Sequence, residues 1–271
     1  MPISFRRMLE HSYPVCAEIE PGKEPEDRWL ETAEQMKPDA FSVVDSPLGI
    51  VRPDPVASSV TLMQKTGIEC IPHLACRDRN AAGLRSSLMA SHQAGIKAIL
   101  ALTGDAGKSG KPVFELNSIT LIELMAEMNK DGYDFFIGAA CNPNAQLDFE
   151  LKRCEQKARA GCHFFVSQPV YDALLAERFY KELKSRTSLP LVIGLLPIVS
   201  YHMAEKMSKV PGIRINEELL HKLKESEDQR IAGLEHALEL AKQLKQYSEG
   251  ALVMPFADPE VFEVVKKELI S

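Results

Sequence analysis

The sequence predicts an α/β protein, a single-domain (β/α)8 TIM barrel, and three observations support this fold class. Short apolar runs of strand length recur about eight times along the chain, which is the number of strands in such a barrel. Segments with helical spacing separate these runs, and the alternation continues without a Pro-, Gly- or Ser-rich linker. Residues 1–271 are therefore expected to form one domain, with a doubly wound open sheet as the structural alternative.

The expected elements follow in chain order. Strands are predicted at residues 15–20, 40–44, 70–74, 98–102, 135–140, 163–167, 191–195 and 251–254. Crossover helices are predicted at residues 27–36, 55–64, 81–93, 118–129, 147–160, 173–183 and 203–208. The last connection is longer and adds helices at 216–225 and 229–247; the second of these carries an apolar stripe at helical spacing, formed by Ile231, Leu234, Leu238, Ala241 and Leu244.

Composition and charge exclude several classes of protein. With 45% hydrophobic residues the chain can bury a full core, and a net charge of -6 argues against a nucleic-acid-binding surface. The longest apolar stretch, residues 189–199, is shorter than the ~20 residues of a membrane span, and no apolar segment follows Arg6 and Arg7 as in a signal peptide. The six cysteines form no C-x-x-C pair, so we expect reduced thiols, no metal site and a cytoplasmic location.

Two glutamates in the first strand are candidate acids. Glu18 and Glu20 alternate with Ala17 and Ile19, so both carboxylates point to one side of the strand, which we expect to be the barrel interior. Desolvation raises the pKa of a carboxylate, which suits it to general acid catalysis near neutral pH. A structural ion pair with a neighbouring arginine or lysine is the alternative role.

Polar residues also follow other strands, and the carboxyl ends of parallel strands meet at one mouth of a barrel. His73 is a candidate for ligand binding or a core histidine bonded to backbone. Asp105 follows a strand that stops at Thr103-Gly104, and it either places a charge in the site or caps a turn. Gln168 has the donors and the acceptor needed to bind the edge of a heterocycle, or it bonds to nearby backbone.

Two further patterns carry less information. Met203 and Met207 lie four residues apart after a strand, and they either line a substrate or only pack. Gly107-Lys108-Ser109 is similar to the tail of a phosphate-binding P-loop, but Leu102 stands where that motif requires its first glycine. A nucleoside triphosphate site is therefore not predicted.

Six motifs in register resemble the methylenetetrahydrofolate reductase family from about residue 15 to residue 255. They are Ala17-Glu18-Ile19-Glu20-Pro21, Pro72-His73-Leu74-Ala75-Cys76, Leu100-Ala101-Leu102-Thr103-Gly104-Asp105, Gly138-Ala139-Ala140-Cys141, Ser167-Gln168-Pro169-Val170-Tyr171 and Gly194-Leu195-Leu196-Pro197. Residues 76–80, 142–144 and 168–171 are most similar to the reductase module that some bacteria fuse behind homocysteine methyltransferase domains. The chain resembles the catalytic barrel of that module alone.

The resemblance implies an enzyme with bound FAD, which takes hydride from NADH, NADPH or a protein donor and passes it to 5,10-methylenetetrahydrofolate in a two-step exchange. Glu18 matches the family's general acid and Asp105 its aspartate near flavin and pterin, so both are expected to be catalytic and to contact substrate. Gln168 matches the glutamine that binds the pterin, and Met203 and Met207 complete the expected substrate-binding set. The expected FAD-binding residues are His73, Thr103, Gly104, Asp105, Ala140, Asn142 and Lys157, with Lys157 as a partner for the diphosphate.

Some positions depart from the family pattern. The family often has threonine where Val44 stands, arginine at Thr103 and tyrosine-proline-glutamate at residues 142–144, so the adenosine contacts are left open. A homo-oligomer and a partner subunit for electron delivery are further expectations. Two alternative functions remain: a pterin-binding methyltransferase barrel without flavin, and a partner-dependent subunit of a reductase complex.

Overall fold

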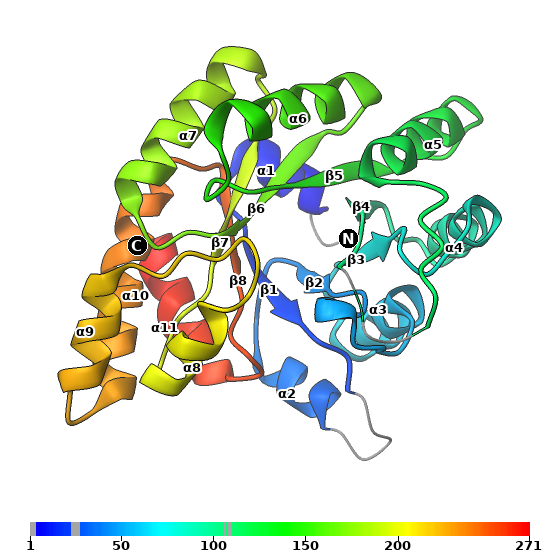
Figure 1. The fold of residues 1–271 in the computed structure, drawn as a ribbon. Helices are drawn as coiled ribbons and strands as arrows, with labels where there is room; N and C mark the ends of the chain where they lie inside the picture. Colours follow the sequence, from blue (N-terminus) through cyan, green and yellow to red (C-terminus); the bar gives the residue numbers. More distant parts are fainter. Residues whose placement is uncertain (1–3, 23–27, 106, 108–109) are drawn as a thin grey trace.

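The computed structural model describes residues 4–22, 28–105, 107 and 110–271, and this part of the chain contains a closed barrel of eight parallel strands (Figure 1). Neighbouring strands in the sequence are neighbours in the barrel, and β8 closes it against β1. This confirms the predicted fold class and rules out the open-sheet alternative. The strands are β1 (Val15–Ile19), β2 (Phe41–Val43), β3 (Cys70–Ala75), β4 (Ala98–Leu102), β5 (Phe136–Cys141), β6 (Phe164–Pro169), β7 (Leu191–Leu195) and β8 (Gly250–Val253).

Helices surround the barrel, and most lie where the periodicity predicts them. These are α2 (Trp29–Gln35), α3 (Pro55–Thr66), α4 (Ala81–Gln93), α5 (Ser118–Lys130), α6 (Leu147–Ala160), α7 (Ala173–Arg186), α8 (Tyr201–Met207), α9 (Glu217–Glu225) and α10 (Gln229–Lys245). Residue 27, the expected start of the first crossover helix, lies outside the described residues. A 3-10 turn, η1 (Pro47–Gly49), follows β2.

Local signals explain where these helices begin. Asp54 precedes Pro55, and its carboxylate accepts hydrogen bonds from two backbone N–H groups at the start of α3. Asn117 and Thr120 form a reciprocal capping box at the start of α5. These caps satisfy N–H groups that have no partner inside the helix.

Two helices of the structure were not predicted. Helix α11 (Pro259–Ile270) begins with an Asp258 cap and a proline at its first position, a start signal that strand counting overlooked. Helix α1 (Phe5–His11) has only seven residues and no side-chain cap. Its sequence therefore carries a weak helical signal, and tertiary packing holds it in place.

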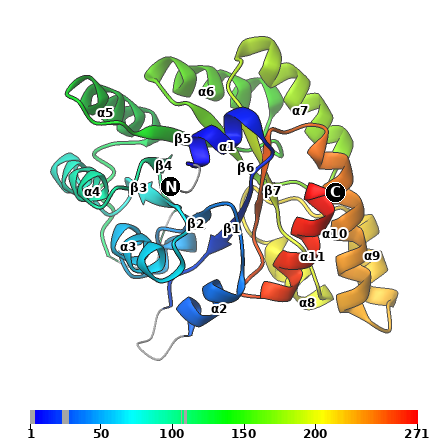
Figure 2. The same ribbon diagram turned by 180° about the vertical axis from the view of Figure 1, so that it is seen from behind.

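The inside of the barrel is a separate apolar core, and α1 closes one end of it. Phe5 packs edge-on against Phe136 at 6.1 Å and Phe164 at 5.3 Å between ring centroids; these residues begin β5 and β6. Gly138 makes room for this cluster, since a Cβ there would lie 2.4 Å from the Phe164 ring. Figure 2 shows α1 on the side of the barrel away from the viewer of Figure 1. The end of the barrel where the strands start is thus filled with aromatic rings.

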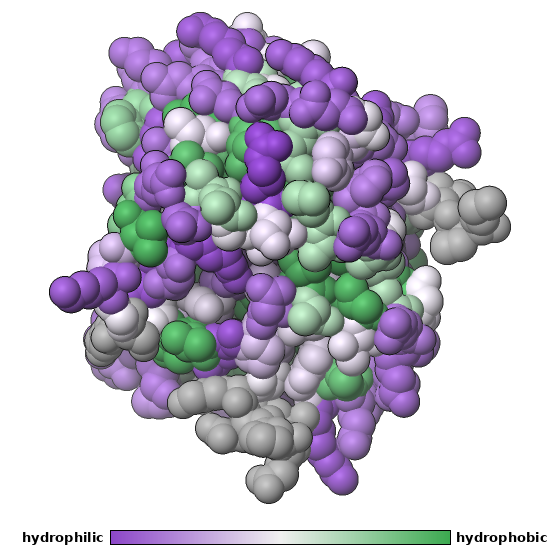
Figure 3. All heavy atoms as spheres, turned by 90° about the vertical axis from the view of Figure 1, so that its right-hand side faces the viewer, coloured by the Kyte–Doolittle hydropathy of each residue, from purple (hydrophilic) through white to green (hydrophobic). Residues whose placement is uncertain are grey.

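The outer surface is mixed in character. Figure 3, which views the molecule from the side of α4 and α5, shows apolar side chains scattered between polar ones. Within the described part of the chain, no helix has the length and apolar character needed to cross a membrane.

Candidate functional site

The residues expected at the site come together at the mouth of the barrel, where the parallel strands end. Glu18 lies on β1, His73 on β3, Ala140 on β5 and Gln168 on β6, and Thr103-Gly104-Asp105 follows β4 directly. Because all eight strands run in the same direction, these positions share one end of the barrel. This is the end opposite to the one that α1 fills.

Glu18 points into the barrel as the period-two pattern predicts. Cys16, two residues earlier, belongs to the interior core, whereas Ala17 and Ile19 pack against the helices. Among the residues the structure describes, the Glu18 carboxyl group has no hydrogen-bond or ion-pair partner. Desolvation, with a smaller contribution from the charge of Glu20, raises the pKa of Glu18 to about 7. A large share of Glu18 is therefore protonated at neutral pH.

Glu20 has the structural role that was the alternative for both glutamates. Arg52 Nε donates a hydrogen bond to one carboxylate oxygen of Glu20, and Arg52 Nη2 forms an ion pair with the same oxygen. Arg52 lies in the loop between β2 and α3, so the ion pair ties that loop to the end of β1. The two glutamates therefore differ: Glu20 is paired with Arg52, whereas Glu18 has no partner in the part of the chain that the structure describes.

His73 lies inside the barrel, where its ring is hydrogen-bonded to a side chain on the neighbouring strand. Its Nε2 is 2.7 Å from the hydroxyl oxygen of Ser42 on β2, and both residues are buried. Burial lowers the pKa of His73 to about 4, so the imidazole is neutral at pH 7. The bond to a serine hydroxyl replaces the backbone hydrogen bond that was the alternative expectation.

The loop after β4 places Asp105 at the surface of the mouth. Gly104 has a φ of 94°, a left-handed conformation that favours glycine, and a Cβ there would lie 2.8 Å from the Cβ of Arg77. The exposed Asp105 carboxylate accepts a hydrogen bond from Leu48 N at 2.8 Å, so it stabilises the neighbouring β2–α3 loop. Thr103 is engaged elsewhere, because its hydroxyl contacts the backbone N–H and the side chain of Ser118 at the start of α5.

The Lys157 side chain is buried, in contrast to the exposed position that a diphosphate partner would suggest. Its Nζ donates a hydrogen bond to the carbonyl oxygen of Ala140 at 2.6 Å, and only 3% of the residue is exposed. Lys157 thus holds the end of β5 from the adjacent helix α6. The nearby Asn142 side chain accepts a hydrogen bond from Asn144 N, and the Asn144 amide in turn bonds to the carbonyls of Pro169 and Gly212.

Gln168 is exposed at the end of β6, and its side-chain amide has no partner among the described residues. Met203 and Met207 are partly buried on α8 and pack against the core between barrel and helices. The packing role therefore holds for both methionines. Their place in a substrate site stays a prediction.

Ser42 and Arg52 are site residues that the sequence reasoning missed. Ser42 interrupts the apolar run at residues 40–44, and the alternation that put Glu18 inside the barrel also places Ser42 there. Arg52 lies in a loop, where no periodicity indicates what it contacts.

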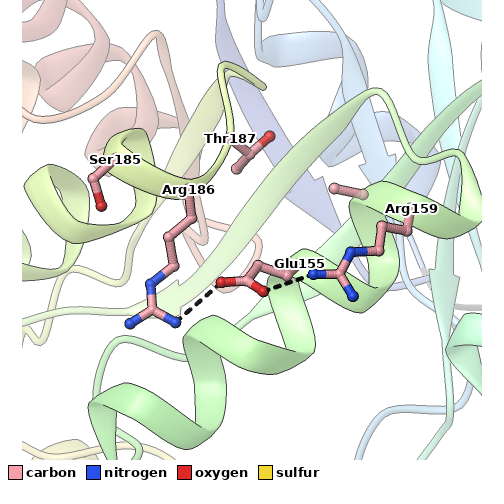
Figure 4. A pocket seen from close by; sticks show the side chains of 6 residues that line it. Glu155, Arg159, Ser185, Arg186 and Thr187 are labelled. Carbon is pink, nitrogen blue, oxygen red and sulfur yellow. Dashed lines mark hydrogen bonds and ion pairs between the residues drawn. The ribbon is translucent and has the colours of Figure 1, made fainter.

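A surface pocket of about 590 Å³ lies away from this site, between α6 and α7 (Figure 4). Its lining residues are Glu155, Ala158, Arg159, Ser185, Arg186 and Thr187. Both arginines pair with Glu155 at 3.1 Å, and Arg186 also pairs with Asp148 at 3.4 Å, so two carboxylates offset the two positive charges. The lining residues lie toward the carboxyl ends of α6 and α7, and those helix ends are on the side of the barrel that α1 closes. The pocket is therefore not part of the mouth.

Comparison with known proteins adds independent findings. A family model described as methylenetetrahydrofolate reductase matches residues 11–254 of the chain. The 5,10-methylenetetrahydrofolate reductase of Buchnera aphidicola subsp. Schizaphis graminum is 26% identical over 223 residues, which cover 77% of this chain and 73% of that protein. The 5,10-methylenetetrahydrofolate reductase of Escherichia coli (strain K12) is 30% identical over 163 residues, covering 57% of this chain and 52% of that protein, so the alignment spans about half of its length.

Solved structures show the same fold. An uncharacterized protein from Clostridium thermocellum, described as binding two copies of 5-methyl-5,6,7,8-tetrahydrofolic acid, aligns with a TM-score of 0.76 at 16% identity and covers 98% of both chains. A 2,3-dimethylmalate lyase aligns with a TM-score of 0.60 at 15% identity, covering 97% of this chain and 84% of that one. These likenesses support the barrel architecture.

Proposed function

Because the chain belongs to the methylenetetrahydrofolate reductase family, we propose that it reduces 5,10-methylenetetrahydrofolate to 5-methyltetrahydrofolate, with Glu18 as the general acid. The observation that carries the proposal is a carboxyl group at the barrel mouth that has no partner among the described residues and whose pKa desolvation raises to about 7. Such a group holds a proton at neutral pH and can donate it to a substrate atom.

The proton has a defined use in this reaction. Glu18 protonates the bridging nitrogen of the folate, the five-membered ring opens, and the resulting iminium carbon accepts hydride. Asp105 stabilises the developing positive charge, because its carboxylate is exposed at the same mouth. Gln168 offers free amide donors and an acceptor to the pterin, and Met203 and Met207 border the substrate from α8.

FAD is the cofactor that supplies the hydride when bound, and the donor groups of the mouth partly fit it. His73 Nδ1 and the Gln168 amide have no protein partner among the described residues, and Gly104 keeps the backbone after β4 free of a side chain. Asp105, Asn142 and the backbone around Thr103 and Ala140 complete the proposed cofactor-binding set. The Lys157 ammonium would reach a diphosphate only by leaving Ala140 O, so we assign it first to the support of β5.

Other parts of the proposal follow from family membership. NADH, NADPH or a reduced protein serves as electron donor, and the barrel assembles as a homo-oligomer with or without an electron-delivering partner subunit. The similarity to the reductase module of bifunctional proteins is part of the same proposal.

One experiment tests the function directly. The purified protein should show flavin absorbance, lose it on addition of NADH or another donor, and regain it with 5,10-methylenetetrahydrofolate. Glu18→Gln should keep the first two steps and slow the third by on the order of a hundredfold, the usual scale for loss of a general acid.

The control for this experiment is Glu10→Gln, which removes an exposed carboxylate on α1. Folate reduction at the normal rate in Glu18→Gln would remove Glu18 from the acid role. A colourless protein that still binds folate would instead support a pterin-binding methyltransferase. Flavin that no donor reduces in the isolated protein would support the partner-dependent subunit.

A further inference from the structure

One arginine holds both ends of the loop between β2 and α3. Arg79 Nη1 is ion-paired with Asp45 Oδ2, two residues after β2, and Arg79 Nη2 lies 3.2 Å from Asp54 Oδ2, directly before α3. The Asp45 side chain is only 5% exposed, so its charge needs a partner inside the protein. Residues 46–53 therefore lie between two points that a single guanidinium fixes. We call Arg79 with its two carboxylates the arginine clamp.

Each carboxylate of the arginine clamp also bonds to backbone. Asp45 Oδ2 accepts a hydrogen bond from Ala75 N at 2.9 Å, at the end of β3. Asp54 divides its two oxygens, since Oδ1 caps α3 by accepting from two backbone N–H groups while Oδ2 faces Arg79. The clamp thus fixes one end of the loop to β3 and the other end to α3.

Between these two ends the loop has an uncommon backbone conformation. Ser46 has a φ of 48° and Leu48 a φ of 54°, in the left-handed region that residues with a Cβ seldom adopt. A Cβ at Gly49 would overlap the Cα of Gly107 in the β4–α5 loop, so the two loops are in close backbone contact. Such a conformation persists only where the surroundings determine it. The arginine clamp is part of those surroundings.

The backbone of Leu48 connects this loop to Asp105. Leu48 N donates a hydrogen bond to Asp105 Oδ2 at 2.8 Å, and among the described residues it is the one hydrogen-bond partner of that carboxylate. The loop has further contacts that do not involve Asp105, which are the arginine clamp and the ion pair of Arg52 with Glu20. The hydrogen bond therefore orients an exposed carboxylate from a loop that is fixed independently.

We infer that Arg79 is a positioning residue for Asp105, because it clamps both ends of the β2–α3 loop and so holds Leu48 N–H where it orients the Asp105 carboxylate. The inference rests on the proposed function for the role of Asp105 in folate reduction, whereas the clamp and the hydrogen bond belong to the protein alone. The role requires a guanidinium, since its planar fork presents separate N–H groups to two carboxylates. A lysine at residue 79 keeps the charge without this fork.

The first test follows the Leu48 amide in the ligand-free protein. In Arg79→Lys, hydrogen exchange at Leu48 N, measured by NMR, should be about tenfold faster, which corresponds to about 1.4 kcal/mol of local opening free energy. Amides of the barrel strands should exchange as in the unchanged protein. Arg186→Lys is the matched control, because Arg186 also pairs with two carboxylates but lines the pocket away from the mouth. Unchanged exchange at Leu48 N in Arg79→Lys overturns the inference.

A milder variant covers the case in which Arg79→Lys weakens the whole fold. Asp54→Asn removes one ion pair of the arginine clamp and keeps an oxygen that can cap α3. The Asp54 side chain is 45% exposed, so we expect the barrel to stay intact. Exchange at Leu48 N should again be faster than in the unchanged protein, and a normal rate would contradict the clamp.

The second test combines variants in the folate reaction, the step in which methylenetetrahydrofolate reoxidises the reduced flavin. Arg79→Lys should slow this step by about tenfold, less than the roughly hundredfold loss that a 1 Å misplacement can cause. In protein that already carries Asp105→Asn, the same change should slow it by less than about twofold, because the charge that Arg79 positions is absent. A tenfold loss in both backgrounds overturns the inference, since Arg79 then acts without Asp105.

The outcomes separate this inference from the proposed function. If the unchanged protein reduces no folate, the proposed function fails, while exchange at Leu48 N still decides whether Arg79 clamps the loop. Folate reduction in the unchanged protein, together with normal Leu48 exchange or additive rate effects in the variants, contradicts the positioning role alone.

Discussion

At the scale of single residues, burial inside the barrel favours the uncharged form of both Glu18 and His73. Burial raises the pKa of Glu18 to about 7 and lowers the pKa of His73 to about 4. Both shifts have the same cause, because a charge inside the barrel loses its hydration. Between about pH 4 and pH 7, both side chains are therefore mostly uncharged.

This has a consequence for stability that can be measured without substrate. The folded-state pKa of Glu18 lies above its unfolded value of 4.5, so its contribution is full below pH 4.5 and is lost as pH rises through 7. Replacing Glu18 by glutamine removes the ionisation. Urea denaturation of the ligand-free protein should show Glu18→Gln to be more stable than the wild type by roughly 1–3 kcal/mol at pH 8.5 and nearly equal at pH 4.5.

The Glu10→Gln control, in which the carboxylate is exposed, should show no such difference between the two pH values. A Glu18→Gln curve parallel to that of the wild type would mean that Glu18 is solvated in the folded protein. The general-acid assignment would then lose its physical basis.

Asp105 allows its charge to be separated from its structural hydrogen bond. Asp105→Asn keeps an oxygen that can accept from Leu48 N, so the β2–α3 loop should retain its position. Loss of the negative charge should weaken folate binding and change the flavin reduction potential together. Titration with folate measures the affinity, and a redox titration of the flavin measures the reduction potential. The control is Asp134→Asn, which changes an exposed carboxylate near the start of β5. If neither quantity changes, Asp105 is only a turn residue.

At the scale of elements, α1 is defined by what it covers. Its seven residues have no side-chain cap, yet Phe5 is 1% exposed among the rings that begin β5 and β6. Tertiary packing therefore compensates for weak local propensity, as is common for short helices. For this reason periodicity did not predict α1. Helix α11 is a different case, because its start signal, Asp258-Pro259, is present in the sequence and was overlooked.

The packing of α1 gives a stability prediction. Phe5→Ala should destabilise the protein by about 3–5 kcal/mol, because it leaves a cavity against Phe136 and Phe164. Phe149→Ala, on the outer face of α6 where 58% of the residue is exposed, should change the free energy of unfolding by less than about 1 kcal/mol. Chemical denaturation measures both, and equal effects would show that α1 contributes little to the closed end.

At the scale of the whole molecule, the barrel was predictable because the spacing of apolar residues along the chain indicates each strand and most helices. The polar residues at the strand ends were predictable for the same reason, since parallel strands deliver them to one mouth. The partners of those residues were not. Ser42 and His73 lie 31 residues apart, and Lys157 and Ala140 lie 17 apart, so only the closed sheet brings each pair together.

The cluster of Phe5, Phe136 and Phe164 at the start of the strands has a consequence for the proposed reaction. In the proposed reductase, the hydride donor and folate would both have to enter at the mouth, because aromatic rings fill the other end of the barrel. If the two reactants share one binding space, the first product has to leave before the second reactant binds, and steady-state kinetics should give parallel double-reciprocal lines; intersecting lines would show that both bind at once.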